Sequence, residues 1–342
     1  MSKVNRQWLL KRRPEGSLNL DDFEYREVGV PNGDLNPGEI LVRNMAFLCA
    51  PTMRNWMDPP GKNLHPTTEL GEPVIALSVG EVVKSANSEL PVGARVSLIS
   101  NWQDYTLVSG TILRPPTILP DGISYTDAMG RFGINPMAAY LGLLEIGQPK
   151  EGETLVVSGA AGSTGSTAAQ IGKLKGLRVI GIAGGKEKCE WLTDDCGLDA
   201  TIDYKSEDVG ARMAELCPDG IDIYYDNVGG DILQAAVDNM AKFGRIVLCG
   251  QISSYDSGES PEGPRNMMRL IYGGIRMQGF LVSHFVERIP EAIAALREWA
   301  DAGKIVYRED LRTGFENLPG SYLSLFDGTN AGTLIVQVDD SA

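Results

Sequence analysis

Three glycines spaced three residues apart mark the stretch whose composition first suggests chemistry. Gly159, Gly162 and Gly165 lie in VVSGAAGSTGS, after an apolar segment and before residues with helical spacing. Glycines in such a turn let backbone N–H groups and a helix N-terminus approach a pyrophosphate. A tight strand-to-helix turn also favours glycine, but a second apolar segment, RVIGIAG, follows as a dinucleotide fold requires. The pattern predicts a dinucleotide site at Gly159, Ala160, Gly162, Ser163, Thr164 and Gly165.

The end of the next apolar segment indicates which dinucleotide this site binds. An NAD site usually has Asp or Glu about 20 residues beyond the glycines, where it contacts the ribose hydroxyls. This chain has no acid at the tip formed by Gly184 and Gly185, and Lys186 and Lys188 follow at once. The alternative is that both lysines are simply solvated, although lysine is slightly unfavourable in a first helical turn. We expect the turn at Gly185 and Lys188 to accept the 2′-phosphate of NADPH.

Alternating strand and helix patterns must position these residues. Continuous apolar runs are typical of buried parallel strands, and the segments between them have helical spacing and terminal glycines. Consecutive units of this kind predict a doubly wound parallel sheet. The predicted strands are 154–160, 178–184, 200–204, 221–229, 244–250 and 276–282, and the predicted helices are 125–133, 135–147, 166–176, 186–197, 206–217, 231–244 and 291–303.

Both ends of the chain have the pattern of a β domain. Short β segments separated by turn residues occur at 40–48, 74–85, 94–100 and 102–108, and the pattern returns in 333–338. We therefore expect an α/β protein in which residues 1–125 and 311–342 form a β domain. A nucleotide-binding domain, residues 126–310, is inserted between them.

Composition excludes several functional classes. The 342 residues carry 45 acidic and 31 basic side chains, a net charge of −14, which disfavours binding to nucleic acid or to an anionic membrane surface. The one dense basic run, Lys11-Arg12-Arg13, is more typical of a solvated edge than of a binding patch. Five widely spaced cysteines, no signal peptide and no membrane-spanning run predict a cytoplasmic protein.

Six motifs together resemble the zinc-free medium-chain dehydrogenase/reductases. These are WQDY, AYLGLLEIGQPKEGETLVVSGAAGSTGS, DYK, YYDNVGG, CGQISSY and GTNAGTLIV, in that order. Within that superfamily the chain is similar to prostaglandin reductases, plant alkenal double-bond reductases and bacterial curcumin reductases. The resemblance implies a GroES-like β-barrel domain beside a Rossmann domain. It also implies NADPH-dependent reduction of the C=C bond of α,β-unsaturated aldehydes or ketones, and a homodimer paired through 276–282.

The resemblance also implies roles for single residues. Lys188 would hold the adenosine 2′-phosphate, with Tyr204 of DYK at the same end of the cofactor. Asn227 of DNVGG and Asn330 of GTNAG would anchor the nicotinamide half, and Tyr255 of CGQISSY would lie over the substrate.

The chain departs from its relatives where the substrate binds. The relatives commonly read SVDPYMRG where this chain has LCAPTMRN, so that an acid and an aromatic are replaced by Ala50 and Thr52. Thr333 also stands in place of a lysine. We expect Thr52 to line a more open substrate pocket.

A zinc site is not expected. Catalytic zinc needs about three ligands from Cys, His and Asp/Glu. Cys49 falls near the first ligand of the zinc alcohol dehydrogenases, but Leu70-Gly71-Glu72 lacks the histidine of that branch. The two histidines, His65 and His284, lie in no ligand motif, and no close-set cysteine cluster exists. Cys49 is therefore predicted to be a small buried residue.

Metal-free reduction of an enone needs a hydride at the β carbon and a donor to the carbonyl oxygen. Tyr255 is the candidate donor, at the start of a polar segment, 254–264, that is predicted to be a flexible flap. The alternative is that Tyr255 is a surface loop residue. Met267 and Met268 could line an apolar pocket, although helix packing is the better explanation for them. A quinone or carbonyl reductase and a non-catalytic NADPH-binding protein remain open as alternatives.

Overall fold

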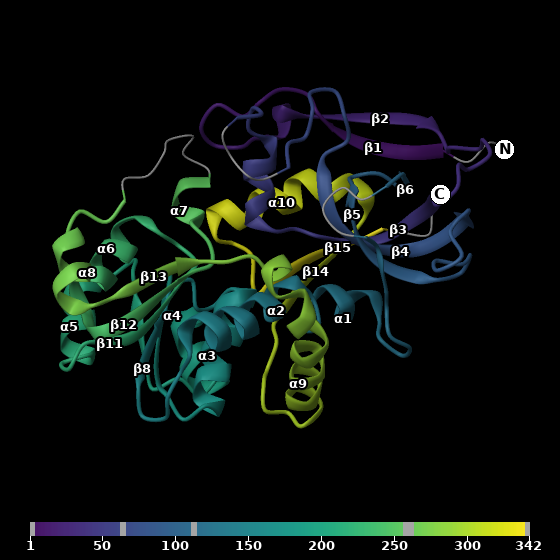
Figure 1. Cartoon of the computed structure of the whole chain (residues 1–342). Helices are drawn as coiled ribbons and strands as arrows, with labels where there is room; N and C mark the ends of the chain where they lie inside the picture. Colours follow the sequence, from purple (N-terminus) through teal and green to yellow (C-terminus); the bar gives the residue numbers. More distant parts are fainter. Residues whose placement is uncertain (1–3, 62–65, 111–114, 256–262, 339–342) are drawn as a thin grey trace. The chain divides into compact units, whose positions relative to one another are not determined.

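The computed structural model describes residues 4–61, 66–110, 115–255 and 263–338. The chain divides into two compact units, which are described separately (Figure 1). The terminal unit comprises Met1–Met129, Tyr255–Gly258 and Glu309–Ala342, and the central unit comprises Gly130–Ser254 and Glu259–Arg308. Among the described residues, no helix is long and apolar enough to cross a membrane.

The central unit is built on a six-stranded sheet in the order β10-β9-β8-β11-β12-β13, and all neighbouring strands are parallel. The chain starts at β8 and moves outward to β10, then returns to the other side of β8 and moves outward to β13. The strand order therefore reverses between β8 and β11. The strands are β8 (Thr154–Val157), β9 (Arg178–Ala183), β10 (Ala200–Asp203), β11 (Ile221–Asp226), β12 (Met240–Leu248) and β13 (Arg276–Gly279).

Helices cover both faces of this sheet. Leu155 and Val157 of β8 belong to one core cluster, which includes Ile171 from α3. Val156 points to the opposite face and belongs to a second cluster, with Val237 from α6. Burial on both faces explains why the strands are continuously apolar. The helical segments are α2 (Ile134–Leu141), η3 (Gly142–Gly147), α3 (Ser163–Leu174), α4 (Lys186–Asp194), α5 (Val209–Leu216), α6 (Gly230–Asn239), α7 (Ile252–Tyr255), α8 (Met267–Gly273), η4 (Val282–Arg288) and α9 (Ile289–Asp301).

Several predicted boundaries in the central unit are wrong. The helix expected over 231–244 ends at Asn239, because Met240 is extended and begins β12. The helix expected over 135–147 has the predicted extent, although its second half, from Gly142, is π-helical; a Cβ on Gly142 would lie 2.5 Å from the Phe280 ring. The strand expected over 276–282 ends at Gly279, and a 3-10 helix begins at Val282.

The terminal unit contains a seven-stranded sheet and a separate hairpin of β1 and β2. The sheet path is β14-β15-β3-β4-β5-β7, and β6 pairs with β3. Most pairs are antiparallel, and β14 is parallel to β15. The strands are β1 (Val4–Leu10), β2 (Phe23–Gly29), β3 (Ile40–Leu48), β4 (Ile75–Ser85), β5 (Arg95–Asn101), β6 (Tyr105–Val108), β7 (Thr117–Ile118), β14 (Glu309–Thr313) and β15 (Thr333–Gln337).

Helical segments of the terminal unit differ from the predictions. The helix expected over 125–133 is the short α1 (Tyr125–Met129), which ends before the glycine at 130. The strand expected over 102–108 begins only at Tyr105. Helix α10 (Leu318–Asp327) was not predicted, although Pro319 near its start is a common first-turn residue. The 3-10 segments are η1 (Leu20–Asp22), η2 (Pro51–Met57) and η5 (Phe315–Asn317).

The basic run at residues 11–13 is structural rather than merely solvated. The Arg12 Nε lies 2.6 Å from the Asp22 carboxylate. Arg13 donates hydrogen bonds of 2.8 Å to the carbonyl of Met57 and 2.6 Å to that of Thr68. Arg13 thereby fixes the loop around η2, and the run is not a free basic patch.

Candidate active site

The glycine loop joins β8 to α3 through a close approach of backbone to backbone. A Cβ on Gly165 would lie 2.9 Å from the Cα of Ala160 and closer still to the carbonyl oxygen of Gly159. Gly159 itself has a φ of +57°, which L side chains rarely adopt. Gly162 is the N-cap of α3, so no side chain caps the first N–H groups of the helix. Ser163 and Thr164 open α3, and the loop thus has the form of a phosphate cradle.

The turn after β9 lies against the end of β10. A Cβ on Gly184 would meet the Tyr204 ring at 2.8 Å, so glycine is required for the ring to lie there. Gly185 has a φ of +92°, and its N–H donates a 2.8 Å hydrogen bond to the Asp203 carboxylate. This bond and a second one from the Lys205 N–H lower the pKa of Asp203. Asp203 thus orders the turn, a role that the sequence did not reveal.

The two lysines after this turn differ in their surroundings. Lys186 is exposed, and its Nζ lies 3.4 Å from the Glu190 carboxylate along α4. Lys188 is half-buried in the first turn of α4. Lys188 is thus the less exposed of the two, and its role at the 2′-phosphate stays a prediction.

Asn227 follows β11, at the point where the strand order reverses. Its Nδ2 donates a 2.7 Å hydrogen bond to the carbonyl of Ser158, which directly follows β8. A Cβ on Gly159 would lie 3.4 Å from the Asn227 Cβ, so Asn227 lies beside the glycine loop. The neighbouring Asp226 is buried, and burial raises its pKa. Sequence reasoning identified Asn227 but missed Asp226 and Ser158.

The central unit therefore collects the predicted cofactor residues at one edge of its sheet. The glycine loop, the Gly185 turn, Tyr204 and Asn227 follow the carboxyl ends of four adjacent strands, β8, β9, β10 and β11 (Figure 1). In open α/β sheets, ligands bind at this edge, where the strand order reverses. The glycines that no larger residue could replace, above all Gly165, fit a dinucleotide lying against the loop.

Thr52 and Asn330 lie at the same end of a strand pair in the terminal unit. Thr52 is half-buried in η2, just after β3, and Asn330 is half-buried just before β15. The two strands are antiparallel, and the Cys49 N–H donates a 3.0 Å hydrogen bond to the Leu334 carbonyl. The segment that follows β3 and the segment that precedes β15 therefore meet the sheet at the same end of these two strands.

Tyr255 ends α7, where the chain passes from the central to the terminal unit. It is half-buried. The start of α7 is tied to the loop after β11, because the Ser253 N–H donates a 3.1 Å hydrogen bond to the Val228 carbonyl. The predicted flap lies largely at 256–262, outside the described residues.

Cys49 is buried, as predicted, at 3% exposure. Burial raises the pKa of its thiol to about 12. Within the part of the chain that the structure describes, no group of three or more His, Cys, Asp or Glu side chains could hold a metal ion. His65 lies outside the described residues, and the His284 Nδ1 accepts a hydrogen bond from the Leu281 N–H.

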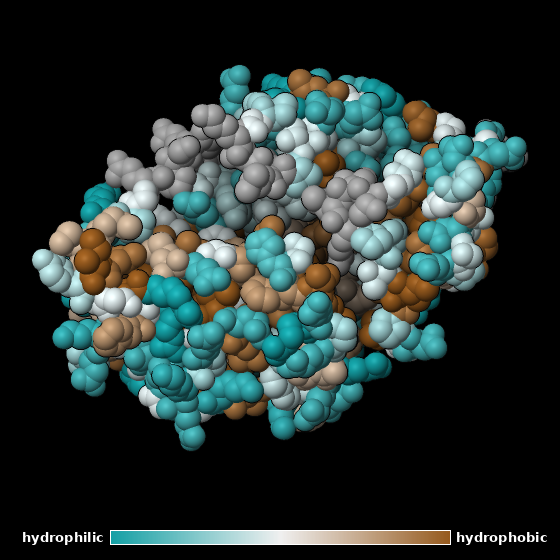
Figure 2. All heavy atoms as spheres, in the orientation of Figure 1, coloured by the Kyte–Doolittle hydropathy of each residue, from teal (hydrophilic) through white to brown (hydrophobic). Residues whose placement is uncertain are grey.

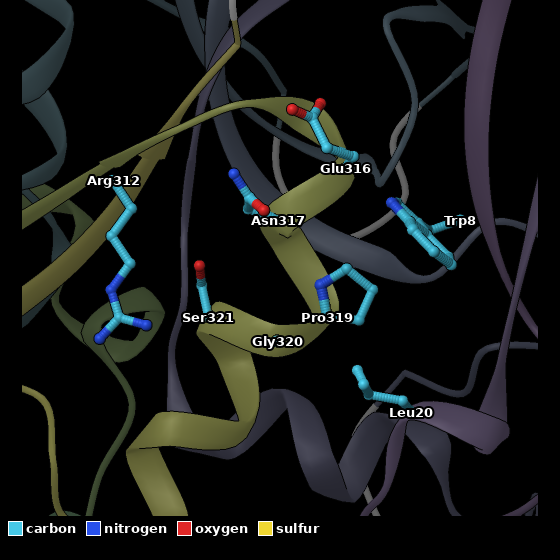
Figure 3. A pocket seen from close by; sticks show the side chains of 8 residues that line it. All are labelled: Trp8, Leu20, Arg312, Glu316, Asn317, Pro319, Gly320 and Ser321. Atoms are coloured by element: carbon cyan, nitrogen blue, oxygen red, sulfur yellow. The ribbon is translucent and has the colours of Figure 1, made fainter.

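A hollow of about 520 Å³ in the terminal unit contains none of the predicted site residues. Figure 3 shows the Arg312 side chain from β14 next to Ser321 from α10 on one side, and Trp8 and Leu20 on the other. Arg312 is paired with Asp310 at 2.9 Å. The lining residues are Trp8, Leu20, Arg312, Glu316, Asn317, Pro319, Gly320 and Ser321.

Family models match segments of both units, and known proteins are similar to the whole chain. The family model "N-terminal domain of oxidoreductase" matches residues 6–115, and the model "Zinc-binding dehydrogenase" matches residues 163–298. The chain is 40% identical to a putative NADP-dependent oxidoreductase, YfmJ, of Bacillus subtilis, over 99% of each chain. It is 38% identical to the NADPH-dependent curcumin reductase of Escherichia coli, over 98% of this chain and 97% of the relative.

A solved structure confirms the predicted fold. CurA from Vibrio vulnificus in complex with NADPH has a TM-score of 0.88 and 39% identity, over 98% of this chain and 99% of that one. The predicted barrel-like and Rossmann domains and the NADP cofactor are therefore confirmed. The chain belongs to the medium-chain dehydrogenase/reductase family, among its NADP-dependent oxidoreductases.

Proposed function

We propose that this protein reduces the C=C bond of α,β-unsaturated ketones or aldehydes with NADPH, by hydride transfer to the β carbon. The observation that carries the proposal is the tight glycine loop at the start of α3, in a chain similar over its whole length to an NADPH-dependent curcumin reductase. Curcumin contains carbonyl groups conjugated with C=C bonds, so its reductase acts on the proposed class of substrate.

The proposal divides the work between the two units. In the central unit the N–H groups at the start of α3 bind the pyrophosphate, and Lys188 and Tyr204 bind the adenosine end. Asn227 holds the nicotinamide half. Bound NADPH supplies the hydride.

The terminal unit receives the substrate in this proposal. Tyr255 donates a hydrogen bond to the carbonyl oxygen, where negative charge develops as the β carbon accepts the hydride. Thr52 lines a pocket wider than that of relatives with an aromatic residue there, and aryl enones therefore fit it. The proposed reaction needs no metal, and Cys49 serves in it only as a small buried residue.

We further propose a homodimer formed through β13, which is the outer strand of its sheet. An unpaired strand edge is a ready template for antiparallel pairing with a second copy. Exposed apolar side chains lie near this edge, on α8 and in the segment after β13 (Figure 2). They are Met267, Met268, Ile271, Leu281 and Val286, and the exposure of the two methionines argues against their predicted role in helix packing.

Light scattering at several protein concentrations tests the dimer. The wild type should have twice the mass of one chain, and Gln278→Pro, in the middle of β13, should shift it toward the monomer. A wild-type monomer would contradict this part of the proposal.

The proposal places the protein in a reducing compartment such as the cytoplasm. This is consistent with the five cysteines, none of which forms a disulfide within the described residues.

Product analysis tests the proposed reaction. The purified protein should oxidise NADPH in the presence of 4-phenyl-3-buten-2-one and release the saturated ketone. An allylic alcohol as product would instead identify a carbonyl reductase. Turnover of quinones alone would identify a quinone reductase, and NADPH binding without turnover of any of these would indicate a binding protein.

A further inference from the structure

A buried carboxylate lies at the end of β11, next to Asn227, the residue proposed to hold the nicotinamide half of the cofactor. Asp226, the last residue of β11, is 1% exposed, and no ion pair among the described residues includes it. Its charge is balanced by hydrogen-bond donors instead. The N–H groups of Val228 and Gly229 donate to it at 3.0–3.1 Å, and the Tyr224 hydroxyl donates at 3.1 Å.

Ser158 connects this carboxylate to the glycine loop. Its hydroxyl is fully buried and donates a 2.8 Å hydrogen bond to Asp226 Oδ1. The same hydroxyl accepts a 2.9 Å hydrogen bond from the Asn227 N–H. One hydroxyl therefore bridges the ends of β8 and β11, at the reversal of strand order.

Ser158 also contacts the Asn227 side chain, through its main-chain carbonyl next to the bridge. The Asn227 Nδ2 donates to the Ser158 carbonyl at 2.7 Å, while no hydrogen bond to Oδ1 is found among the described residues. An amide held in this way presents an acceptor, and it is complementary to a hydrogen-bond donor. The nicotinamide half of NADPH offers such donors in its ribose hydroxyls and its carboxamide N–H.

We propose that Ser158 and Asp226 are positioning residues that fix Asn227 with its Oδ1 as an acceptor for a donor on the nicotinamide half of NADPH. The inference rests on the proposed function only in that NADPH is the ligand of this edge. It predicts that a substitution that removes the Ser158–Asp226 hydrogen bond weakens binding of the nicotinamide half of NADPH. Binding of the adenosine end, at Lys188 and Tyr204, should be unaffected.

Two ligands separate these ends of the site. NADPH reaches both, whereas adenosine 2′,5′-bisphosphate reaches only the adenosine end. Ser158→Ala should raise the dissociation constant of NADPH about tenfold, the effect of one well-placed hydrogen bond, and change that of the bisphosphate less than about twofold. Asp222→Asn is the matched control, because the Asp222 carboxylate also joins β11 to β8, through a 2.8 Å bond from the Thr154 N–H at the amino ends. It should leave both dissociation constants unchanged.

A double-mutant cycle distinguishes positioning from general loosening. Because Ser158 acts through Asn227, Ser158→Ala should add little to the NADPH dissociation constant of Asn227→Ala. Additive losses, an equal loss of both ligands in Ser158→Ala, or an unchanged NADPH constant would each overturn the inference. If Ser158→Ala does not fold, Asn227→Ala must still raise the dissociation constant of NADPH without changing that of the bisphosphate. If it does not, the inference is overturned. A wild type that does not bind NADPH would refute the cofactor assignment itself.

Discussion

Gly165→Ala tests whether the glycine loop is as tight as the structure indicates. Gly165 is the third residue of α3, a position where alanine would ordinarily be preferred by up to about 1 kcal/mol. Here the added methyl group would lie 2.9 Å from the Ala160 Cα and nearer still to the Gly159 carbonyl oxygen. Both neighbours are backbone atoms, so the loop and the helix must move apart.

The expected cost follows from this crowding. Overpacking a buried site typically costs about 1–3 kcal/mol, which exceeds the gain in helix propensity. The free energy of unfolding should therefore fall by about that amount. The dissociation constant of NADPH should rise at least about tenfold, because the displaced N–H groups are those proposed to bind the pyrophosphate.

Urea unfolding and NADPH fluorescence titration measure the two effects. Gly210→Ala is the matched control, because Gly210 lies in α5 and its added Cβ would meet nothing closer than 3.5 Å. That variant should gain about 0.4–1 kcal/mol of stability and bind NADPH normally. If Gly165→Ala is as stable as the control and binds NADPH equally well, the close approach and the cradle built on it are refuted.

The remaining predictions concern single functions of the site. Lys188→Ala should raise the dissociation constant of NADPH by about 10–100-fold and hardly change that of NADH, because only NADPH loses a charge-assisted contact with the 2′-phosphate. Equal rises in titrations of the two cofactors would refute the role of Lys188. Tyr255→Phe should lower kcat and kcat/KM for enones together, at or below the low end of the roughly 10²–10³-fold range, without changing the NADPH dissociation constant; an unaltered kcat would remove it from the mechanism. Thr52→Tyr should penalise aryl enones but not short alkenals in steady-state assays, whereas equal losses would place Thr52 outside the pocket. Activity should survive EDTA, and elemental analysis should find no stoichiometric zinc; one zinc per chain, lost with activity, would contradict metal-free catalysis.

The central unit was predictable because its signals are local. A strand buried on both faces must be continuously apolar, and 178–184 and 200–204 had that pattern along their whole length. The glycines at 159, 162 and 165 and the acid-free turn at Gly185, on which the predicted cofactor site rests, do follow β8 and β9 directly. In the terminal unit, strand β3 was also predicted with its observed bounds, 40–48.

The interactions between strands were not predictable, because they join residues far apart in the sequence. Asp203 looked like an ordinary strand-end residue, yet it accepts a hydrogen bond from Gly185 in another loop. Ser158 and Asp226 are 68 positions apart, and only the pairing of β8 with β11 brings them together. The helix predicted over 231–244 ended early because β12 extends its pairing back to Met240, where tertiary structure outweighs helical spacing.

The fate of the transferred hydrogen tests the central claim most directly. The protein is incubated with 4-phenyl-3-buten-2-one and NADPH that carries deuterium at both positions of nicotinamide C4, and the product is examined by NMR. The account predicts the saturated ketone with one deuterium on the β carbon. Deuterium on the carbinol carbon of an allylic alcohol, or no incorporation into any product, would contradict it.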